Sequence, residues 1–269
     1  MEISTKGKYY GELNSEMSFN GILLTKYNYH EDHTPWHYHE NPYFMFVLHG
    51  NMIDRNKKVK TLCPPGGLIF TNWQEIHQGA KHSSKAGGFH LELEKRWFEK
   101  YDISSIDLEG SLNLENPLIK GLMNKVFLET KINDNHSQSS IELLILDIFN
   151  KMKNPQLHVD SKRPRPNWIK KLSEIILDAE VDYSLSSLSQ ELNVHPVHLS
   201  REFHKYFGST LGQYIRQIKL NEAIILMSTK KFSLTEICYK CGFYDQSHFI
   251  ANFKSTYKIT PSQFLKRIF

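Results

Sequence analysis

The sequence predicts a two-domain α+β protein, in which an antiparallel β sandwich or barrel followed by helices precedes an all-α domain. Three observations lead to this prediction. Short segments rich in β-branched and aromatic residues recur through the first 95 positions, a proline-containing stretch interrupts the chain near residue 160, and the last hundred residues contain an internal repeat. Each half of the chain therefore has its own type of secondary structure.

The chain length and the proline-containing stretch define the expected domain bounds. A chain of 269 residues exceeds the usual size of one domain. The stretch KNPQLHVDSKRPRPNW (153–168) holds three prolines and no apolar periodicity, and proline disfavours helix in the residue before it. We expect a first domain over residues 1–153, a linker over 154–166 and a second domain over 167–269.

The composition argues against membrane-spanning and disulfide-stapled classes of protein. No apolar run approaches the roughly 18 residues that span a bilayer, and the start MEISTKGKYYGELNSE lacks the apolar core of a signal peptide. Three cysteines are too few for a disulfide framework and fit a reducing compartment. We expect a cytoplasmic protein with no membrane partner.

Charge is distributed unevenly between the two halves. Residues 163–269 carry 15 Lys and Arg against 9 Asp and Glu, whereas the rest of the chain carries 18 against 20. Eight of the 14 histidines lie in the first 90 residues. The basic second half and the histidine-rich first half are expected to bind different partners.

The first domain begins with strand-like segments. They are FNGILLTKYNY (19–29), YFMFVLHG (43–50), GGLIFTN (66–72) and GFHLELE (88–94), separated by Gly, Pro and Asn clusters. This pattern is typical of an antiparallel sandwich or barrel.

Two amphipathic helices are expected to follow, over residues 116–132 and 139–152, where apolar residues stand three and four apart. The apolar stripe of the second helix is unusually wide. It either packs against the β domain of its own chain or forms the seam of a dimer, and the sequence leaves both open. We expect a homodimer.

The segment HTPWHYHENPYFMFVLHG (33–50) resembles the first motif of the cupin barrel, in which a His-x-His pair precedes a strand that ends in glycine. His37 and His39 match the pair, and Gly50 matches the glycine. A second cupin-like motif follows in PPGGLIFTNWQEIHQG (64–79), where His77 falls at the histidine of the motif. The resemblance covers roughly residues 30–95 and implies a cupin-like β-barrel.

A catalytic cupin carries a carboxylate about four residues after the second histidine, which completes a site for iron or manganese. Tyr43 occupies that position here, and Glu40 is three residues away, about 10 Å along a strand and on its other face. We therefore expect no bound metal and no cofactor.

Two other interpretations of the histidines remain. They are hydrogen-bonded residues of the barrel, or they line a pocket whose imidazoles and aromatic rings suit a polyhydroxylated or planar ligand. The ligand-binding residues expected in that second case are Trp36, His37, His39, Tyr43 and His77.

The second domain contains two copies of one pattern, beginning at Ser184 and at Ser233. An offset of 49 pairs Asn193 with Gly242, and after one inserted residue an offset of 50 pairs Phe203 with Phe253. The copies therefore predict two helix-turn-helix units.

The second helix of each unit, expected over residues 196–207 and 246–257, is the one that enters the major groove in this motif. Ser233 and Glu236 form a capping box, and Pro196 suits the first turn of a helix. A helical connector over residues 210–229 spans roughly 28 Å, close to the ~34 Å of one DNA turn. The spacing and charge favour double-stranded DNA as the partner.

The segments HPVHLSREF, LGQYI, EICYKCGFYDQSHFIANFK and TPSQFLK resemble the DNA-binding domain of the AraC/XylS family over the last hundred residues. The resemblance implies a sequence-specific transcriptional regulator, expected to be an activator. Its control by a small-molecule effector, such as a sugar, in a cupin-like domain is also implied, as is RNA polymerase as a further partner.

Matching the family pattern position by position gives the expected DNA-binding residues. Those facing the groove are Val197, Ser200, Arg201, Gln246 and Ser247, and those near phosphates are His204, Lys205, Lys254 and Ser255. Two positions depart from the pattern. Ala251 stands where many relatives carry arginine, and Lys258 replaces the glycine that usually precedes Thr-Pro. We expect the first unit to provide more of the sequence specificity.

The function expected from the sequence is a DNA-binding regulator, not an enzyme, whose N-terminal domain binds an effector. The alternative is a metal-dependent cupin enzyme fused to a DNA-binding module, because three histidines are present.

Overall fold

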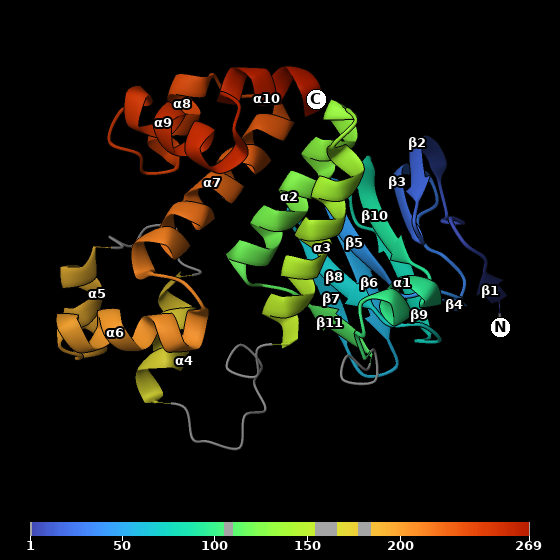
Figure 1. Ribbon diagram of the computed structural model, residues 1–269, viewed down its shortest axis with the longest axis horizontal. Helices are drawn as coiled ribbons and strands as arrows, with labels where there is room; N and C mark the ends of the chain where they lie inside the picture. The colour runs from blue at the N-terminus through green and yellow to red at the C-terminus, as the bar shows by residue number, and fades with distance from the viewer. Residues whose placement is uncertain (1, 105–109, 154–165, 177–183, 269) are drawn as a thin grey trace.

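The computed structural model describes residues 2–104, 110–153, 166–176 and 184–268. Apart from Pro166, the predicted linker lies outside these residues. Figure 1 shows a β sandwich, two helices packed along it and a helical C-terminal part on the other side of those helices. None of the described helices is long and apolar enough to span a membrane.

The β sandwich contains two sheets, and the predicted mixed α+β fold is confirmed. One has the order β1 (Glu2–Ser4), β4 (His37–His39), β9 (His77–Lys81), β6 (Met52–Asn56) and β7 (Lys60–Cys63). The other has the order β11 (Ser111–Asn113), β8 (Leu68–Thr71), β5 (Tyr43–His49), β10 (Ala86–Leu93), β3 (Ile22–Tyr29) and β2 (Glu12–Phe19). All pairs in these sheets are antiparallel except β1 with β4. Among the described strands the two sheets share no ladder, so the predicted barrel is an open sandwich.

Strand β5 shows why the central strands are apolar without interruption. Successive side chains of a strand point to opposite faces. Tyr43 and Met45 belong to the cluster between the sheets, whereas Phe44 and Phe46 belong to the cluster under the helices. Because both faces are covered, both sets are buried.

Helices α2 (Pro117–Ile132) and α3 (Ser137–Lys153) cover the outer face of the second sheet, after the short helix α1 (Lys95–Lys100). In α3, Ile141, Ile145, Ile148 and Phe149 are at most 1% exposed and join the core under the sheet. The wide stripe thus packs mainly against its own chain, while Leu143 remains 67% exposed.

The C-terminal helices follow the predicted repeat closely. The first unit consists of α4 (Asn167–Ile176), α5 (Leu185–Leu192) and α6 (Pro196–Phe207), and the connector is α7 (Leu211–Thr229). The second unit consists of α8 (Leu234–Lys240), α9 (Gln246–Tyr257) and α10 (Pro261–Ile268). The bounds of α6 and α9 equal the predicted ones, because proline, the Asp245 cap and apolar spacing define them locally.

Lys258 adopts the turn conformation that glycine usually supplies. Its φ is 64°, and the equivalent residue of the first unit, Gly208, has φ 65°. The turn at Lys258 is therefore retained despite the unusual residue, at the steric cost that a side chain meets in the left-handed region.

Substitutions at Lys258 and Gly208 should change the free energy of unfolding in opposite directions. We expect Lys258→Gly to raise the free energy of unfolding by about 0.5–1 kcal/mol, and Gly208→Lys to lower it by about 1 kcal/mol, because only glycine adopts positive φ freely. Urea denaturation of each variant measures this. A loss of stability in Lys258→Gly would contradict the strain argument.

The two units differ in the core they join. The first unit has its own hydrophobic cluster, which includes Leu199 and Phe203. The second unit, with Phe249 and Phe253, shares one continuous cluster with the N-terminal sheet and helices. The second unit is thus docked on the N-terminal domain, which the predicted division at the linker did not anticipate.

Candidate functional site: a DNA-binding surface and a histidine-lined cavity

All nine predicted DNA-binding residues are exposed. In α6, Val197, Arg201 and His204 recur at the spacing that places side chains on one helix face, while Leu199 and Phe203 are buried on the other. In α9, Gln246, Ser247, Lys254 and Ser255 are likewise exposed. Each recognition helix therefore has a solvent-facing polar side opposite a packed side.

The side chains that are predicted to face the DNA groove differ in the hydrogen bonds they already make. The amide of Gln246 donates a 2.8 Å hydrogen bond to the hydroxyl of Thr235, which a bidentate contact with adenine would have to break. The Arg201 guanidinium has only long contacts, 3.5 Å from the Glu202 carboxylate and 3.4 Å from His198 Nδ1. Arg201 is therefore better prepared to bind a base than Gln246.

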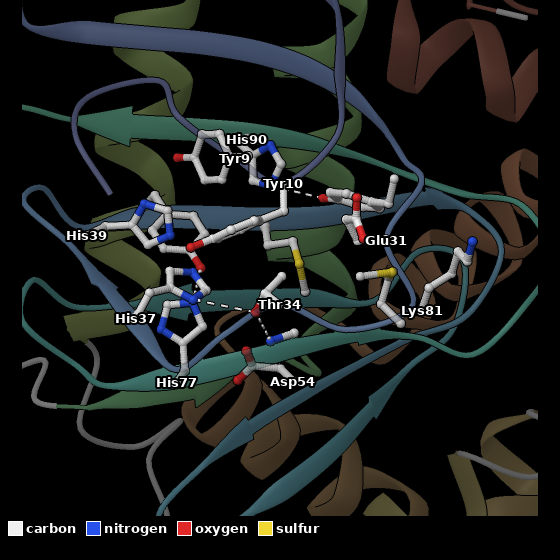
Figure 2. Close-up of a pocket in the computed structure, with 15 residues that line it drawn as sticks. Tyr9, Tyr10, Glu31, Thr34, His37, His39, Asp54, His77, Lys81 and His90 are labelled. Atoms are coloured by element: carbon white, nitrogen blue, oxygen red, sulfur yellow. Dashed lines mark hydrogen bonds between the residues drawn. The ribbon is translucent and has the colours of Figure 1, made fainter. Parts of the chain in front are cut away.

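A cavity of about 50 Å³ lies inside the β sandwich. Figure 2 shows imidazole and phenol rings converging on it from both sheets. Of the residues predicted to bind a ligand, His37, His39, Tyr43 and His77 line this cavity. The structure therefore brings together four of the five.

Trp36 is the exception among the five residues predicted to bind a ligand. It is not among the residues that line the cavity, and its ring lies 5.7 Å from the guanidinium carbon of Arg55. Because His37 and His39 point inward along β4, the alternation of the strand directs their immediate neighbours away from the cavity.

Three histidines form a close cluster. His37 and His77 are register partners on β4 and β9, each of the three is 3% exposed, and one ring nitrogen of each lies within 4.8 Å of the others. In the described part of the chain, this is the one group of three or more His, Cys, Asp or Glu residues close enough to share an ion.

Hydrogen bonds define the tautomers of two of these rings. His37 Nδ1 lies 2.9 Å from the carbonyl oxygen of Pro35, and His77 Nδ1 lies 3.0 Å from that of Glu75. A carbonyl only accepts, so both Nδ1 atoms carry hydrogen and both Nε2 atoms keep a lone pair. The Tyr43 hydroxyl consequently donates to His77 Nε2, at 2.9 Å.

The cavity favours uncharged imidazoles. Burial, followed by the neighbouring histidines, lowers the pKa of His39 to about 2, and burial with His77 lowers the pKa of His37 to about 4. Burial alone lowers the pKa of His90 to about 3. Burial, reinforced by Glu75, raises the pKa of Asp54 to about 7. At neutral pH these three imidazoles are therefore uncharged, while Glu31, Asp54 and Lys81 also line the cavity.

The sequence prediction missed several cavity residues. Tyr9 stacks on His90 with ring centroids 3.7 Å apart, and its hydroxyl donates to Glu92 at 3.2 Å. Tyr10, Tyr29 and Asp54 also line the cavity. His90 was detectable as an inward-facing residue, because it alternates with buried Phe89 and Leu91 in β10. No local pattern indicates Tyr9.

The cupin-like motifs of the sequence imply a metal ion at this place, and the donor set fits one. Three neutral imidazoles are a known ligand set for Zn²⁺ and similar ions, and a tetrahedral site needs their nitrogens about 3.3 Å apart. His37, His39 and His77 would hold such an ion, which would supply a Lewis-acidic centre. The ring nitrogens lie within 4.8 Å of one another, so the three side chains would have to move closer together to bind one ion.

Acid should destabilise the fold through His90. Its folded pKa lies below the unfolded value, so the unfolded state binds a proton first as pH falls, and stability is lost below about pH 6.5. The raised pKa of Asp54 stabilises the folded state as the pH falls below 7. The lowered pKa values of His37 and His39 destabilise the folded state in acid, as that of His90 does.

We expect the stability lost between pH 7 and pH 5 to be about 2 kcal/mol smaller in His90→Gln than in the parent protein. Denaturation of both proteins at the two pH values measures it. An unchanged loss would show that His90 is not charged on unfolding in this range.

A buried polar network joins the N-terminal domain to the second unit. Asn124 of α2 is 4% exposed and donates to the Asn221 side chain of α7 at 3.3 Å, and Asn221 donates to the Pro117 carbonyl at 2.9 Å. Gln217 donates to Asn221 at 2.9 Å and to the Tyr257 hydroxyl at 3.1 Å. Since Tyr257 ends α9, the network connects the second recognition helix to α2.

Comparisons with known proteins agree with this architecture. Residues 188–267 match a family model described as a helix-turn-helix domain. The arabinose operon regulatory protein of Escherichia coli is 22% identical over 231 residues, covering 81% of this chain and 78% of that protein. The transcriptional activator RhaR of Salmonella arizonae is 22% identical over 204 residues, covering 75% of this chain and 65% of that protein.

Among solved structures, apo ToxT from Vibrio cholerae aligns with a TM-score of 0.43 at 14% identity, covering 93% of this chain and 99% of that one. The sequence matches and the two capped helix-turn-helix units make the chain similar to DNA-binding transcriptional regulators of the AraC type, with the matched helix-turn-helix domain in its C-terminal part.

Proposed function

We propose that α6 and α9 bind successive major-groove segments on one face of a DNA duplex, with the first unit supplying most of the sequence specificity. The observation that carries this proposal is the pair of recognition helices with exposed polar faces, held by one 19-residue connector. Figure 1 shows α7 running from one unit to the other. The nine predicted DNA-binding residues are assigned on this basis.

Selection of DNA from a random pool with the full chain tests the proposal. We expect enriched sequences with two short conserved blocks about one helical turn apart. Recovery of a single block, or of none, would contradict binding by both units.

The cavity in the sandwich is proposed to bind an uncharged effector with several hydroxyl groups, such as a sugar. Neutral imidazoles and phenols offer both donors and acceptors to hydroxyl groups, and Glu31, Asp54 and Lys81 add further polar atoms to the wall. One relative is the arabinose operon regulatory protein of Escherichia coli, which is consistent with a sugar as the effector class.

A thermal-shift screen of the full chain against neutral sugars and charged metabolites tests this choice. A ligand at 100 times its Kd should add about 2.7 kcal/mol of stability. Tyr43→Phe should weaken the response to a sugar, because the phenol is removed from the cavity wall. Stabilisation by anionic metabolites alone would contradict the proposed class.

The docked second unit is the proposed route from effector to DNA. Strand β5 carries Tyr43 into the cavity, and its Val47 exchanges backbone hydrogen bonds with Gly66 and Gly67 at 2.8 and 2.9 Å. A Cβ on Gly66 would lie 2.7 Å from Ile225 of α7, so this turn touches the connector directly. An effector that moves β5 would thereby act on the helix that positions both units.

The remaining assignments follow from this function. An activator would contact RNA polymerase, and two copies of the chain would bind paired DNA sites as a homodimer in the cytoplasm. The alternative of a metal-dependent enzyme has the histidine cluster in its favour, but among the described residues no carboxylate joins that cluster. We therefore assign the domain a sensing role without catalysis.

A further inference from the structure

The exposed faces of the two recognition helices can be compared residue by residue. An offset of 50 positions aligns α6 with α9, since Phe203 and Phe253 are both fully buried and the helices are capped by Gly208 and Lys258, both with positive φ. A helix places residues three, four and seven positions apart on one face. The exposed residues with this spacing are Val197, Ser200, Arg201 and His204 in α6, and Ser247, Ile250, Ala251 and Lys254 in α9.

The centre of this face is polar in α6 and apolar in α9. Ser200 and Arg201 occupy the two central positions of the first unit, whereas Ile250 and Ala251 occupy them in the second. The side chain of Ile250 is 39% exposed, which leaves part of it available to a partner. The second recognition helix therefore offers methyl groups where the first offers a hydroxyl and a guanidinium group.

The surroundings of the α9 face favour a polyanion as that partner. Residues 230–269 carry seven Lys and Arg against two Asp and Glu. Both acidic side chains are used at helix starts, because Glu236 accepts the backbone N–H of Ser233 and Asp245 accepts that of His248. An apolar strip within a basic surface fits the major groove of DNA, where phosphates border the groove and thymine contributes a methyl group to it.

A base that faces Ile250 or Ala251 meets no hydrogen-bonding side chain at these two positions. Only thymine presents a methyl group in the major groove, and that group gains free energy when it leaves water. The polar edges of guanine and adenine would instead lose water without gaining a partner. Gln246 does not offset this loss, since its amide already donates to Thr235 at 2.8 Å.

We propose that Ile250 and Ala251 recognise the methyl groups of thymine, so that the second unit selects A·T pairs by apolar contact. This inference rests on the proposed function, because it needs α9 in the major groove. It adds which base α9 selects and which side chains select it. A methyl contact discriminates less than a bidentate hydrogen bond from Arg201, which agrees with the greater specificity proposed for the first unit.

Replacing thymine by uracil in the second conserved block of the selected DNA tests the proposal, because this change removes only the methyl group. The full chain should bind about 3- to 5-fold more weakly for each contacted thymine that is replaced. Uracil placed between the two blocks is the DNA control and should leave the affinity unchanged. Equal affinity for thymine and uracil throughout the second block would overturn the inference, as would a second block without A·T pairs.

Ile250→Ser is the matched change in the protein, since Ile250 lies outside the buried core. This variant should bind thymine and uracil with equal affinity at one position of the second block, and circular dichroism should show that it is folded. Val197→Ser changes an exposed apolar residue of α6 and should leave the uracil effect in the second block intact. An undiminished uracil effect in Ile250→Ser would overturn the role of Ile250.

Ala251→Arg should exchange one base preference for another. A guanidinium group at this position of α9 can bind guanine, so a new selection with this variant should replace thymine by guanine at one position of the second block. An unchanged second block would contradict the placement of Ala251 against a base. DNA with two blocks but no uracil effect would leave binding by both units intact, whereas selection of a single block would overturn the proposed function itself.

Discussion

Replacing Arg201 with alanine is expected to lower the affinity for selected DNA by about 1–3 kcal/mol, roughly 5- to 150-fold, and to relax the preference at one base pair. The reason is geometric. The Arg201 side chain is 69% exposed on the outer face of α6, and its long contacts to Glu202 and His198 leave its donors available to a guanine. Competition binding with the selected sequence and its single-base variants measures the effect.

Lys254→Ala is the matched comparison, because Lys254 is exposed near the end of α9 and is assigned to phosphate. Its loss should weaken selected and random DNA alike and reduce the salt slope by about one. If Arg201→Ala also weakened both kinds of DNA equally, Arg201 would be a phosphate contact. Gln246→Ala should cost less than Arg201→Ala, since the Gln246 amide is already bonded to Thr235.

The sequence predicted those parts of the fold that are determined by residues close together in the chain. The bounds of α6 and α9 follow from Pro196, Asp245 and the spacing of buried phenylalanines, all within a dozen residues. Strand β5 was recognisable because burial on both faces makes its sequence apolar throughout.

The missed parts depend on contacts between distant residues. Tyr9 reaches His90 across 81 positions of sequence, and short strands such as β6 and β9 have mixed composition because they line a partly polar cavity. Asn124 and Asn221 look like ordinary polar residues of amphipathic helices. Only the folded chain brings them together across 97 positions and makes them part of a domain interface.

Only part of the cavity was predicted, because some of its residues are brought in by contacts between distant parts of the chain. His37, His39 and His77 stand in recognisable motifs, whereas Asp54 has none and enters through the pairing of β6 with β9. The sequence shows that Tyr43 stands where the cupin pattern has a carboxylate. It does not show that His37 and His77 donate ring N–H groups to the carbonyls of Pro35 and Glu75, which orient both imidazoles.

A substitution at the contact between α2 and α7 is expected to lower the free energy of unfolding. Gly121 leaves room for the Gln217 side chain, and a Cβ there would lie 2.5 Å from Gln217 Cδ. Gly121→Ala should therefore displace the Gln217 amide from Asn221 and Tyr257 and leave buried polar atoms unpaired, which costs about 1–3 kcal/mol for each such group. The expected net loss, after the gain in helix propensity, is about 1–2 kcal/mol.

Gly212→Ala is the control that separates this effect from helix propensity. Gly212 also lies in a helix, but a Cβ there meets nothing within 4 Å. This variant should be as stable as the parent protein or up to about 1 kcal/mol more stable. Urea denaturation of the two variants gives the difference, and hydrogen exchange in α2 and α7 should rise only in Gly121→Ala.

The same pair of variants tests whether docking transmits the effector signal. With a ligand identified by thermal shift, the change in DNA affinity on ligand binding should shrink in Gly121→Ala and persist in Gly212→Ala, because only the first loosens α7 from the domain that holds the ligand. A Gly121→Ala protein that is less stable yet keeps the full ligand response would mean that the interface stabilises the chain without carrying the signal. Coupling would then have to pass through the dimer or through the first unit.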